Sequence, residues 1–175
     1  MSKQRLTRQS WIDAGLTALA EQGPSTLSAE PLARHLGTTK GSFYWHFKDV
    51  PAFQTAVVTA WQDTAFDRVA SALQTDGSAP DRLRQFGHDL LGDPVELPLR
   101  GWATTNTAIA EALAQVDAKR LAYLAALLEQ LDLRNPNFAH ACLGALIGMP
   151  QVPGAQRDTS LDAFDTMIDM VLALR

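Results

Sequence analysis

Apolar residues recur along the chain with the spacing of α-helices. Ile12, Leu16 and Leu19 follow one another at intervals of four and three residues, which is the stripe that an amphipathic helix turns toward a core. A Gly-Pro pair follows at residues 23–24 and ends this helix. No stretch shows the period of two that is typical of strands. The pattern predicts an all-α fold of about nine helices.

Two short helices joined by a glycine turn are predicted between Ser28 and Phe47. Ser28 stands where a hydroxyl can accept a free N–H at the start of the first helix, and Thr38 or Thr39 stands at the start of the second. Gly37 between them suits the turn, because glycine adopts positive φ without strain. The segment therefore has the outline of a helix-turn-helix.

The second of these helices has a buried side and an outward side. On a period of 3.6 residues, Phe43 and Phe47 point to one side of it. The other side chains point elsewhere or lie at the borders: Lys40, Ser42, Tyr44, Trp45 and His46. An aromatic pair beneath an arc of hydroxyls, rings and a cation is what a recognition helix needs in the major groove of DNA.

The segment GTTKGSFYWHF resembles the signature G-V-S-K-G-T-L-Y-x-H-F of TetR-type (tetracycline-repressor-like) transcriptional regulators. The resemblance extends through the preceding helix to about Trp61 and departs from the family pattern at Glu30, Val50 and Pro51. It implies an N-terminal DNA-binding domain over residues 1–49 and a ligand-binding and dimerisation domain over residues 50–175. The residues that it assigns to double-stranded DNA are Ser28, Thr38, Thr39, Lys40, Gly41, Ser42, Tyr44, Trp45, His46 and Lys48.

The rest of the chain is predicted to consist of helices separated by loops rich in glycine, proline and polar residues. A long linking helix begins near Pro51, with Asp49 as its cap, and Ser160 is expected to cap the last helix. The expected ranges are 51–74, 81–91, 99–106, 108–131, 136–149 and 160 onward.

In the resembled family an apolar cavity among the middle helices binds a small molecule, and this binding releases the operator. The resemblance therefore implies a repressor with an unidentified effector. The candidate residues for its pocket are Trp61, Phe86, Trp102, Thr105, Tyr123 and Phe138. Plain core packing explains each of them equally well, so a constitutive regulator with a filled core stays open.

The last two helices are the candidates for a homodimer interface. The first is rich in small residues and the second carries an apolar stripe broader than one contact face needs. The expected interface residues are Ala141, Gly144, Ala145, Gly148, Phe164, Met167, Ile168 and Val171. A dimer would place two recognition helices in successive major grooves of a palindromic operator. The alternative is a monomer whose last helix closes the core.

The charge distribution separates the N-terminal part from the rest. The net charge is −4, but residues 1–50 hold six cations and four anions, whereas the rest holds nine cations and fifteen anions. Contacts with phosphates need only a local basic surface. Lys3, Arg5 and Arg8 form either a basic arm beside the phosphates or a disordered start.

Other classes of protein find little support. A single cysteine, Cys142, excludes an intrachain disulfide framework, and the absence of a long apolar run or signal peptide predicts a cytoplasmic protein without a membrane partner. His88, Asp89 and His140 match no metal-ligand spacing. No catalytic or phosphate-binding motif is present, so neither an enzyme nor a cofactor is expected. The alternative function is an all-α enzyme or ligand carrier whose N-terminal unit no longer binds DNA.

Overall fold

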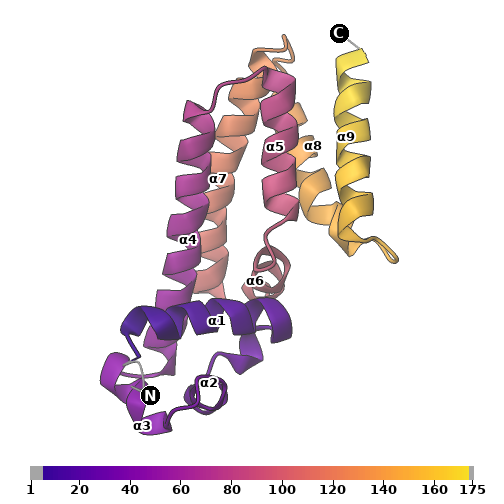
Figure 1. Cartoon of the computed structure of the whole chain (residues 1–175). Helices are drawn as coiled ribbons and strands as arrows, with labels where there is room; N and C mark the ends of the chain where they lie inside the picture. The colour runs from indigo at the N-terminus through magenta and orange to yellow at the C-terminus, as the bar shows by residue number, and fades with distance from the viewer. Residues whose placement is uncertain (1–5, 174–175) are drawn as a thin grey trace. The chain divides into compact units, whose positions relative to one another are not determined.

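The computed structural model describes residues 6–173, and within them the chain forms helices joined by turns and loops (Figure 1). The all-α prediction is confirmed. The helices are α1 (Arg8–Gln22), α2 (Ala29–His35), α3 (Lys40–His46), α4 (Val50–Gln74), α5 (Ala79–Leu91), α6 (Glu96–Ala103), α7 (Thr107–Glu129), α8 (Asn137–Gly148) and α9 (Arg157–Ala173), with short 3-10 turns η1 (Pro24–Thr26) and η2 (Met149–Gln151). Lys3 and Arg5, for which the sequence left a basic arm and a disordered start open, lie outside the described residues. None of the helices in the described part is both long and apolar enough to cross a membrane.

The chain packs as two compact units. The head unit contains the chain up to Thr64 together with Pro94–Leu113, and the body unit contains Ala65–Asp93 together with the chain from Ala114 onward. Helices α4 and α7 contribute residues to both. α6 packs against α1 and η1 and so belongs with the head unit. The DNA-binding domain of residues 1–49 and the ligand-binding and dimerisation domain of residues 50–175 stay predictions.

Helix α1 ends where the Gly-Pro pair predicts, and hydrogen bonds satisfy backbone groups at both of its ends. Thr7 Oγ1 accepts a hydrogen bond from Ser10 N (3.1 Å), and Ser10 Oγ accepts one from Thr7 N (3.3 Å). This reciprocal capping box satisfies amides that have no partner within the helix. At the other end Gly23 adopts φ +82°, a conformation that favours glycine, and its N–H donates to Leu19 O.

Two helices begin three residues earlier than predicted. α6 begins at Glu96 rather than residue 99, because Pro98 falls in its first turn, where the missing N–H has no intrahelical acceptor. α9 begins at Arg157, so the expected cap Ser160 lies inside the helix instead. The Ser160 N–H donates to Gln156 O (3.0 Å), and its buried hydroxyl has no partner among the described residues.

Aromatic rings form the centre of the head unit. Trp11, Phe43 and Phe53 are fully buried, and Phe47 is 4% exposed. The Phe43 centroid lies 5.4 Å from that of Trp11 and 5.2 Å from that of Phe53, both in edge-to-face geometry. Gly15 of α1 permits this packing, since a Cβ there would lie 2.7 Å from Phe53 and from Val57. The core thereby fixes α1 and α3 to the start of α4.

In the body unit, α9 is attached mainly to α5. The fully buried Phe164 ring lies against Gly87, where a Cβ would overlap it. Two polar contacts flank this packing: the ion pair of Arg84 with Asp169, and a hydrogen bond between His88 Nε2 and Asp165 Oδ2 at 3.0 Å. Phe164 and Ile168 are therefore part of the core of their own unit.

Candidate nucleic-acid interface

The turn between α2 and α3 is closed by backbone hydrogen bonds. Gly37 adopts φ +62°, its N–H donates to Arg34 O (3.2 Å), and the Thr38 N–H donates to Ala33 O (2.8 Å). This is the Schellman arrangement, in which a residue in the left-handed region ends a helix, and it confirms the role predicted for Gly37. Ser28 occupies the N-cap position of α2 as predicted, but its hydroxyl makes no capping hydrogen bond.

The start of α3 is capped by Thr39. Its side chain accepts a hydrogen bond from Ser42 N (3.3 Å), which resolves the choice between Thr38 and Thr39. Lys40 and Gly41 then form the exposed first turn. A Cβ added at Gly41 would meet only Thr39 Oγ1, at 3.7 Å. Neither the packing nor the backbone of the head unit requires glycine here, so its small size leaves room for a molecule outside the protein.

The two sides of α3 are those that the periodicity predicts. Phe43 and Phe47 are buried in the aromatic core, whereas Tyr44 is 47% exposed and Trp45 is 90% exposed. The Tyr44 ring meets the edge of Phe43 at 5.2 Å between centroids, so it is anchored at its base. The indole of Trp45 projects almost wholly into solvent. Ser42 and His46 are half-buried between these sides.

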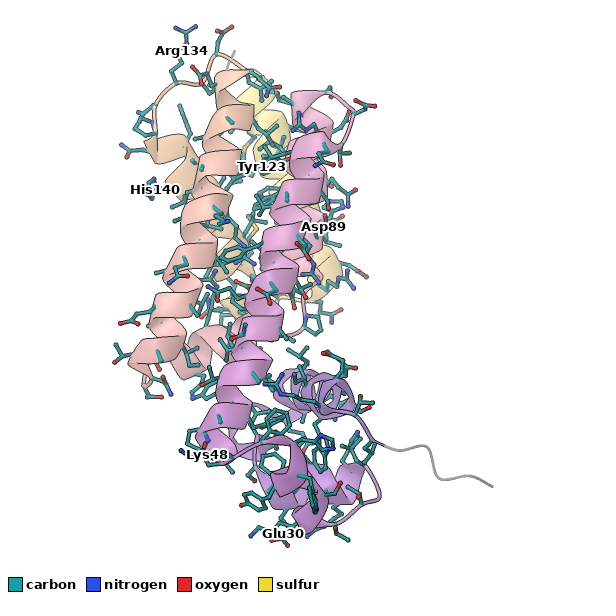
Figure 2. All side chains as sticks on the ribbon, turned by 90° about the vertical axis from the view of Figure 1, so that its left-hand side faces the viewer. Glu30, Lys48, Asp89, Tyr123, Arg134 and His140 are labelled. Atoms are coloured by element: carbon teal, nitrogen blue, oxygen red, sulfur yellow. The ribbon has the colours of Figure 1, made fainter. Side chains whose placement is uncertain are left out.

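The cations near α3 differ in how they are paired. Lys40 and Lys48 are exposed and have no ion pair among residues 6–173, and Lys48 lies at the edge of the head unit (Figure 2). Arg34 is paired with Glu30 at 3.4 Å on the surface of α2. Asp49 is engaged as the predicted cap of α4, where Oδ1 accepts from Ala52 N at 2.8 Å. The charge on this side of the head is therefore locally positive.

One cation has a position that the sequence did not reveal. The Arg8 guanidinium lies over the Phe47 ring, 5.0 Å from its centroid. The sequence placed Arg8 only in a basic N-terminal stretch, because residues 39 apart in the chain give no local signal of contact. The stacking brings a cation of α1 beside the last residues of the recognition helix.

The six candidate pocket residues are divided between the two units. Phe86 and Tyr123 meet in the body unit at 5.5 Å between ring centroids, and the Tyr123 hydroxyl donates to Ala72 O (3.2 Å). The cavity beside Phe86 has a volume of about 30 Å³, which has room for water but not for an organic ligand. Phe138 is 38% exposed on α8. The other three, Trp61, Trp102 and Thr105, belong to the head unit.

The eight candidate interface residues divide into exposed and buried groups. On α8, Ala141 and Gly144 are exposed, and Ala145 and Gly148 are half-buried. On α9, Met167 and Val171 are half-buried, whereas Phe164 and Ile168 are 0% and 1% exposed. Phe164 and Ile168 thus face their own core and are not available to contact a partner. Met170, which is 56% exposed, lies on the open side of α9 instead.

Comparison with known proteins supports the helix-turn-helix assignment. Residues 12–49 match the model of the bacterial regulatory proteins of the tetR family. The transcriptional regulator AcuR of Cereibacter sphaeroides is 40% identical over 83 residues, which cover 46% of this chain and 37% of that protein. The regulator AcrR of Shigella flexneri is 44% identical over 43 residues, 25% of this chain and 20% of that protein. The matches thus span less than half the length of these relatives.

The fold agrees over almost the whole chain. A TetR-family regulator from Rhodococcus sp. superposes with a TM-score of 0.76 at 21% identity, over 94% of this chain and 98% of that one. A transcriptional regulator from Saccharomonospora viridis, solved in complex with choline, gives a TM-score of 0.79 at 16% identity, over 93% and 95%. These likenesses concern the fold alone. Residues 12–49 therefore resemble the helix-turn-helix of tetR-family regulatory proteins, and the described part of the chain shares its helical fold with solved regulators of that kind.

Proposed function

We propose that this protein is a dimeric transcriptional regulator that reads a palindromic operator through the outward side of α3. The observation that carries the proposal is that one side of this helix is packed in the core while the other side exposes large aromatic side chains to solvent. Phe43 and Phe47 anchor it in the core, while Tyr44 and Trp45 are exposed. Large aromatic side chains are costly to leave in water, and a partner that covers them explains their exposure.

The groups on this side match the chemistry of a major groove. Lys40 can donate to guanine O6 and N7 or to a phosphate, and hydroxyls bond phosphate oxygens. Gly41, at the helix start, allows close approach of the backbone. The Trp45 ring offers apolar surface to a thymine methyl group and one N–H donor. Such a regulator acts on DNA in the cytoplasm.

A gel-shift assay tests this proposal. The duplex is the DNA upstream of the protein's own gene, and the variant carries Lys40→Ala and Tyr44→Ala. The wild type should give a salt-sensitive, sequence-selective shift, and the variant should lose it while its circular dichroism and melting temperature stay unchanged. Arg134→Ala is a matched control, because Arg134 lies in the loop after α7 of the body unit (Figure 2). An equal shift with both variants would contradict the proposal.

The dimer is proposed to form through α8 and the open side of α9. α8 contains no Asp, Glu, Lys or Arg and presents the small residues Ala141 and Gly144 to solvent. Small residues let helices approach closely, and a twofold axis would pair the same face of both copies. Met167 and Met170 extend the apolar surface along α9. Phe164 and Ile168 would support this face from within.

We further propose repression that a small molecule relieves. The choline found in the S. viridis structure supports ligand binding by a protein of this fold, and Phe86 supplies an aromatic wall to the small cavity beside it. The cavity of about 30 Å³ beside Phe86 favours a second candidate, a constitutive regulator with a filled core. A thermal-shift screen with small organic molecules separates the two, since a ligand that binds the native state raises the melting temperature. A hit must also weaken the gel shift, and a screen without such hits favours the constitutive regulator.

A further inference from the structure

We infer that Arg8 is an additional DNA contact that binds a phosphate beside the C-terminal end of α3. The inference rests on the proposed DNA binding and names a residue of α1 that lies outside the helix-turn-helix. It starts from the position of the guanidinium over Phe47, 5.0 Å from the ring centroid. Phe47 is the C-cap of α3, so Arg8 reaches the recognition helix at its end.

The ring beneath Arg8 is a fixed platform. Phe47 is 4% exposed and packs at 5.4 Å from Phe43 and 4.9 Å from Phe53, measured between centroids. Arg8 itself is exposed. A guanidinium that stacks on a ring uses its flat face, and its N–H groups remain at the edge. Those groups form the planar fork that binds phosphate oxygens in pairs.

The stability of α1 does not explain a cation at this position. Arg8 is the first residue of α1, where the helix dipole favours negative charge and disfavours positive charge. The capping box of Thr7 and Ser10 already satisfies amides at this end. A cation is therefore placed where the helix gains nothing from it.

The charge of Arg8 is also left unneutralised. No carboxylate pairs with Arg8 among residues 6–173, and three acidic groups of the head have other partners. Asp13 accepts from Gln9 (2.8 Å), Glu30 pairs with Arg34 (3.4 Å), and Asp49 caps α4. An exposed arginine that is held in place by a ring and has no carboxylate partner can bind a phosphate anion.

The spacing of cations along α3 fits the two walls of a groove. Lys40 begins α3, and Arg8 and Lys48 lie at its other end. Seven residues of helix extend about 10 Å, and the major groove is about 12 Å wide. Cations at both ends of α3 can therefore reach the phosphates on the two strands that border the groove. In this arrangement Arg8 would hold the C-terminal end of the recognition helix against one strand.

The competing explanation is that Arg8 only stabilises the end of α3. The salt dependence of DNA binding separates the two, because each phosphate contact releases counterions and makes the slope of log K against log salt more negative by about 0.9. The probe is a labelled duplex selected from a random pool by the full-length wild type. Its binding is followed by fluorescence anisotropy at several salt concentrations for the wild type, Arg8→Ala, Arg8→Gln, Arg8→Lys and the control Arg134→Ala.

For Arg8→Ala and Arg8→Gln, the slope of log K against log salt should be less negative by about 0.9 per bound protomer. Their affinity for the duplex should be roughly ten-fold weaker. Arg8→Lys should keep the slope of the wild type, because it keeps the charge, and so should Arg134→Ala. Arg8→Gln retains much of the stem over Phe47, so its melting temperature should also be kept. An unchanged slope for Arg8→Ala and Arg8→Gln would overturn the inference, whatever their melting temperatures. A wild type that binds no duplex would instead overturn the proposed function.

Discussion

Trp45 is the residue whose environment is hardest to explain by folding alone. Its side chain is 90% exposed, whereas Trp11 in the same unit is fully buried. Both are indoles, so the contrast lies in the surroundings and not in the side chain. Trp11 stabilises the aromatic core, while Trp45 contributes little to the stability of the head and is available to a partner. The two residues can therefore be separated by one type of substitution.

Trp45→Ala should leave the melting temperature nearly unchanged and weaken binding to the selected operator roughly ten-fold, because it removes apolar contact with the groove. Trp11→Ala should instead lower the free energy of unfolding by about 3–5 kcal/mol, the cost of truncating a buried aromatic ring. Thermal denaturation and anisotropy titrations measure the two effects. If Trp45→Ala unfolds the head or leaves operator affinity unchanged, the side of α3 that carries Trp45 does not contact DNA as proposed.

Cys142 shows the opposite case of a reactive group kept from solvent. It is the single cysteine of the chain and is 4% exposed on α8. Burial raises the pKa of the Cys142 thiol by disfavouring the thiolate. Iodoacetamide at neutral pH should therefore modify the native protein far more slowly than the protein in guanidinium chloride, as mass spectrometry can follow. Equal rates in the two states would show that α8 opens freely.

At the scale of elements, the contact between α5 and α9 depends on a missing side chain. Gly87 leaves the space that the Phe164 ring occupies. The pairs Arg84–Asp169 and His88–Asp165 lie on the same two helices and keep them aligned. Exposed ion pairs add little energy, so the packing of the ring is the main contribution. The position of α9, and with it the proposed dimer face, therefore depends on Gly87.

Gly87→Ala should destabilise the protein by about 1–3 kcal/mol, because a Cβ there overlaps the Phe164 ring and overpacks the core. Gly101→Ala is the matched control. Gly101 is an exposed glycine of α6 with open space around its Cβ position, so alanine should stabilise by roughly 0.5–1 kcal/mol. Urea denaturation of both variants measures the difference. A Gly87→Ala protein as stable as the wild type would mean that α9 packs on α5 differently.

The sequence predicted the elements well where local signals determine them. The end of α1 follows from Gly23, and the two sides of α3 follow from the spacing of Phe43 and Phe47. The start of α6 differs from the prediction, because Pro98 predicts a break between helices but lies in the first turn of α6, where proline is tolerated. The sequence could not show that the Phe164 stripe faces its own core, since an apolar stripe does not specify what covers it.

The candidate site was predictable to a similar extent. The exposed residues of α3 could be predicted, because one short segment contains the turn glycine, the capping threonine and the residues of the outward side. The stack of Arg8 on Phe47 depends on tertiary packing between distant parts of the chain, which helical periodicity does not report. The proposed effector pocket would need side chains from several helices, and their spacing in the sequence gives no measure of the volume between them.

At the scale of the whole molecule, DNA reading and dimerisation are expected to depend on each other. A single seven-residue recognition helix offers few base contacts, and two copies on a palindrome double them. The proposed dimer face on α8 lies in the body unit, apart in the sequence from α3. A change on α8 can therefore weaken DNA binding without touching the head.

Ala141→Arg should convert the dimer to a monomer, because it places a charge on an exposed small-residue face of α8. Analytical ultracentrifugation measures the mass, and the same sample is tested for operator binding, which should fall sharply. Ala70→Arg is the matched control, since Ala70 is an exposed alanine of α4 in the body unit and is not one of the proposed contact residues. A wild type that sediments as a monomer, or an Ala141→Arg protein that stays a dimer, would argue against this interface.

The most direct test of DNA reading by α3 is selection from a random duplex pool, followed by titration of the enriched sequence and a scrambled duplex at fixed salt. The wild type should enrich a palindrome whose half-sites lie about one helical turn apart, and bind it about a thousand-fold or more tighter than the scrambled duplex. The variant with Lys40→Ala and Tyr44→Ala should lose this preference while remaining folded. No enrichment by the wild type, or the same enrichment by the variant, would contradict the account.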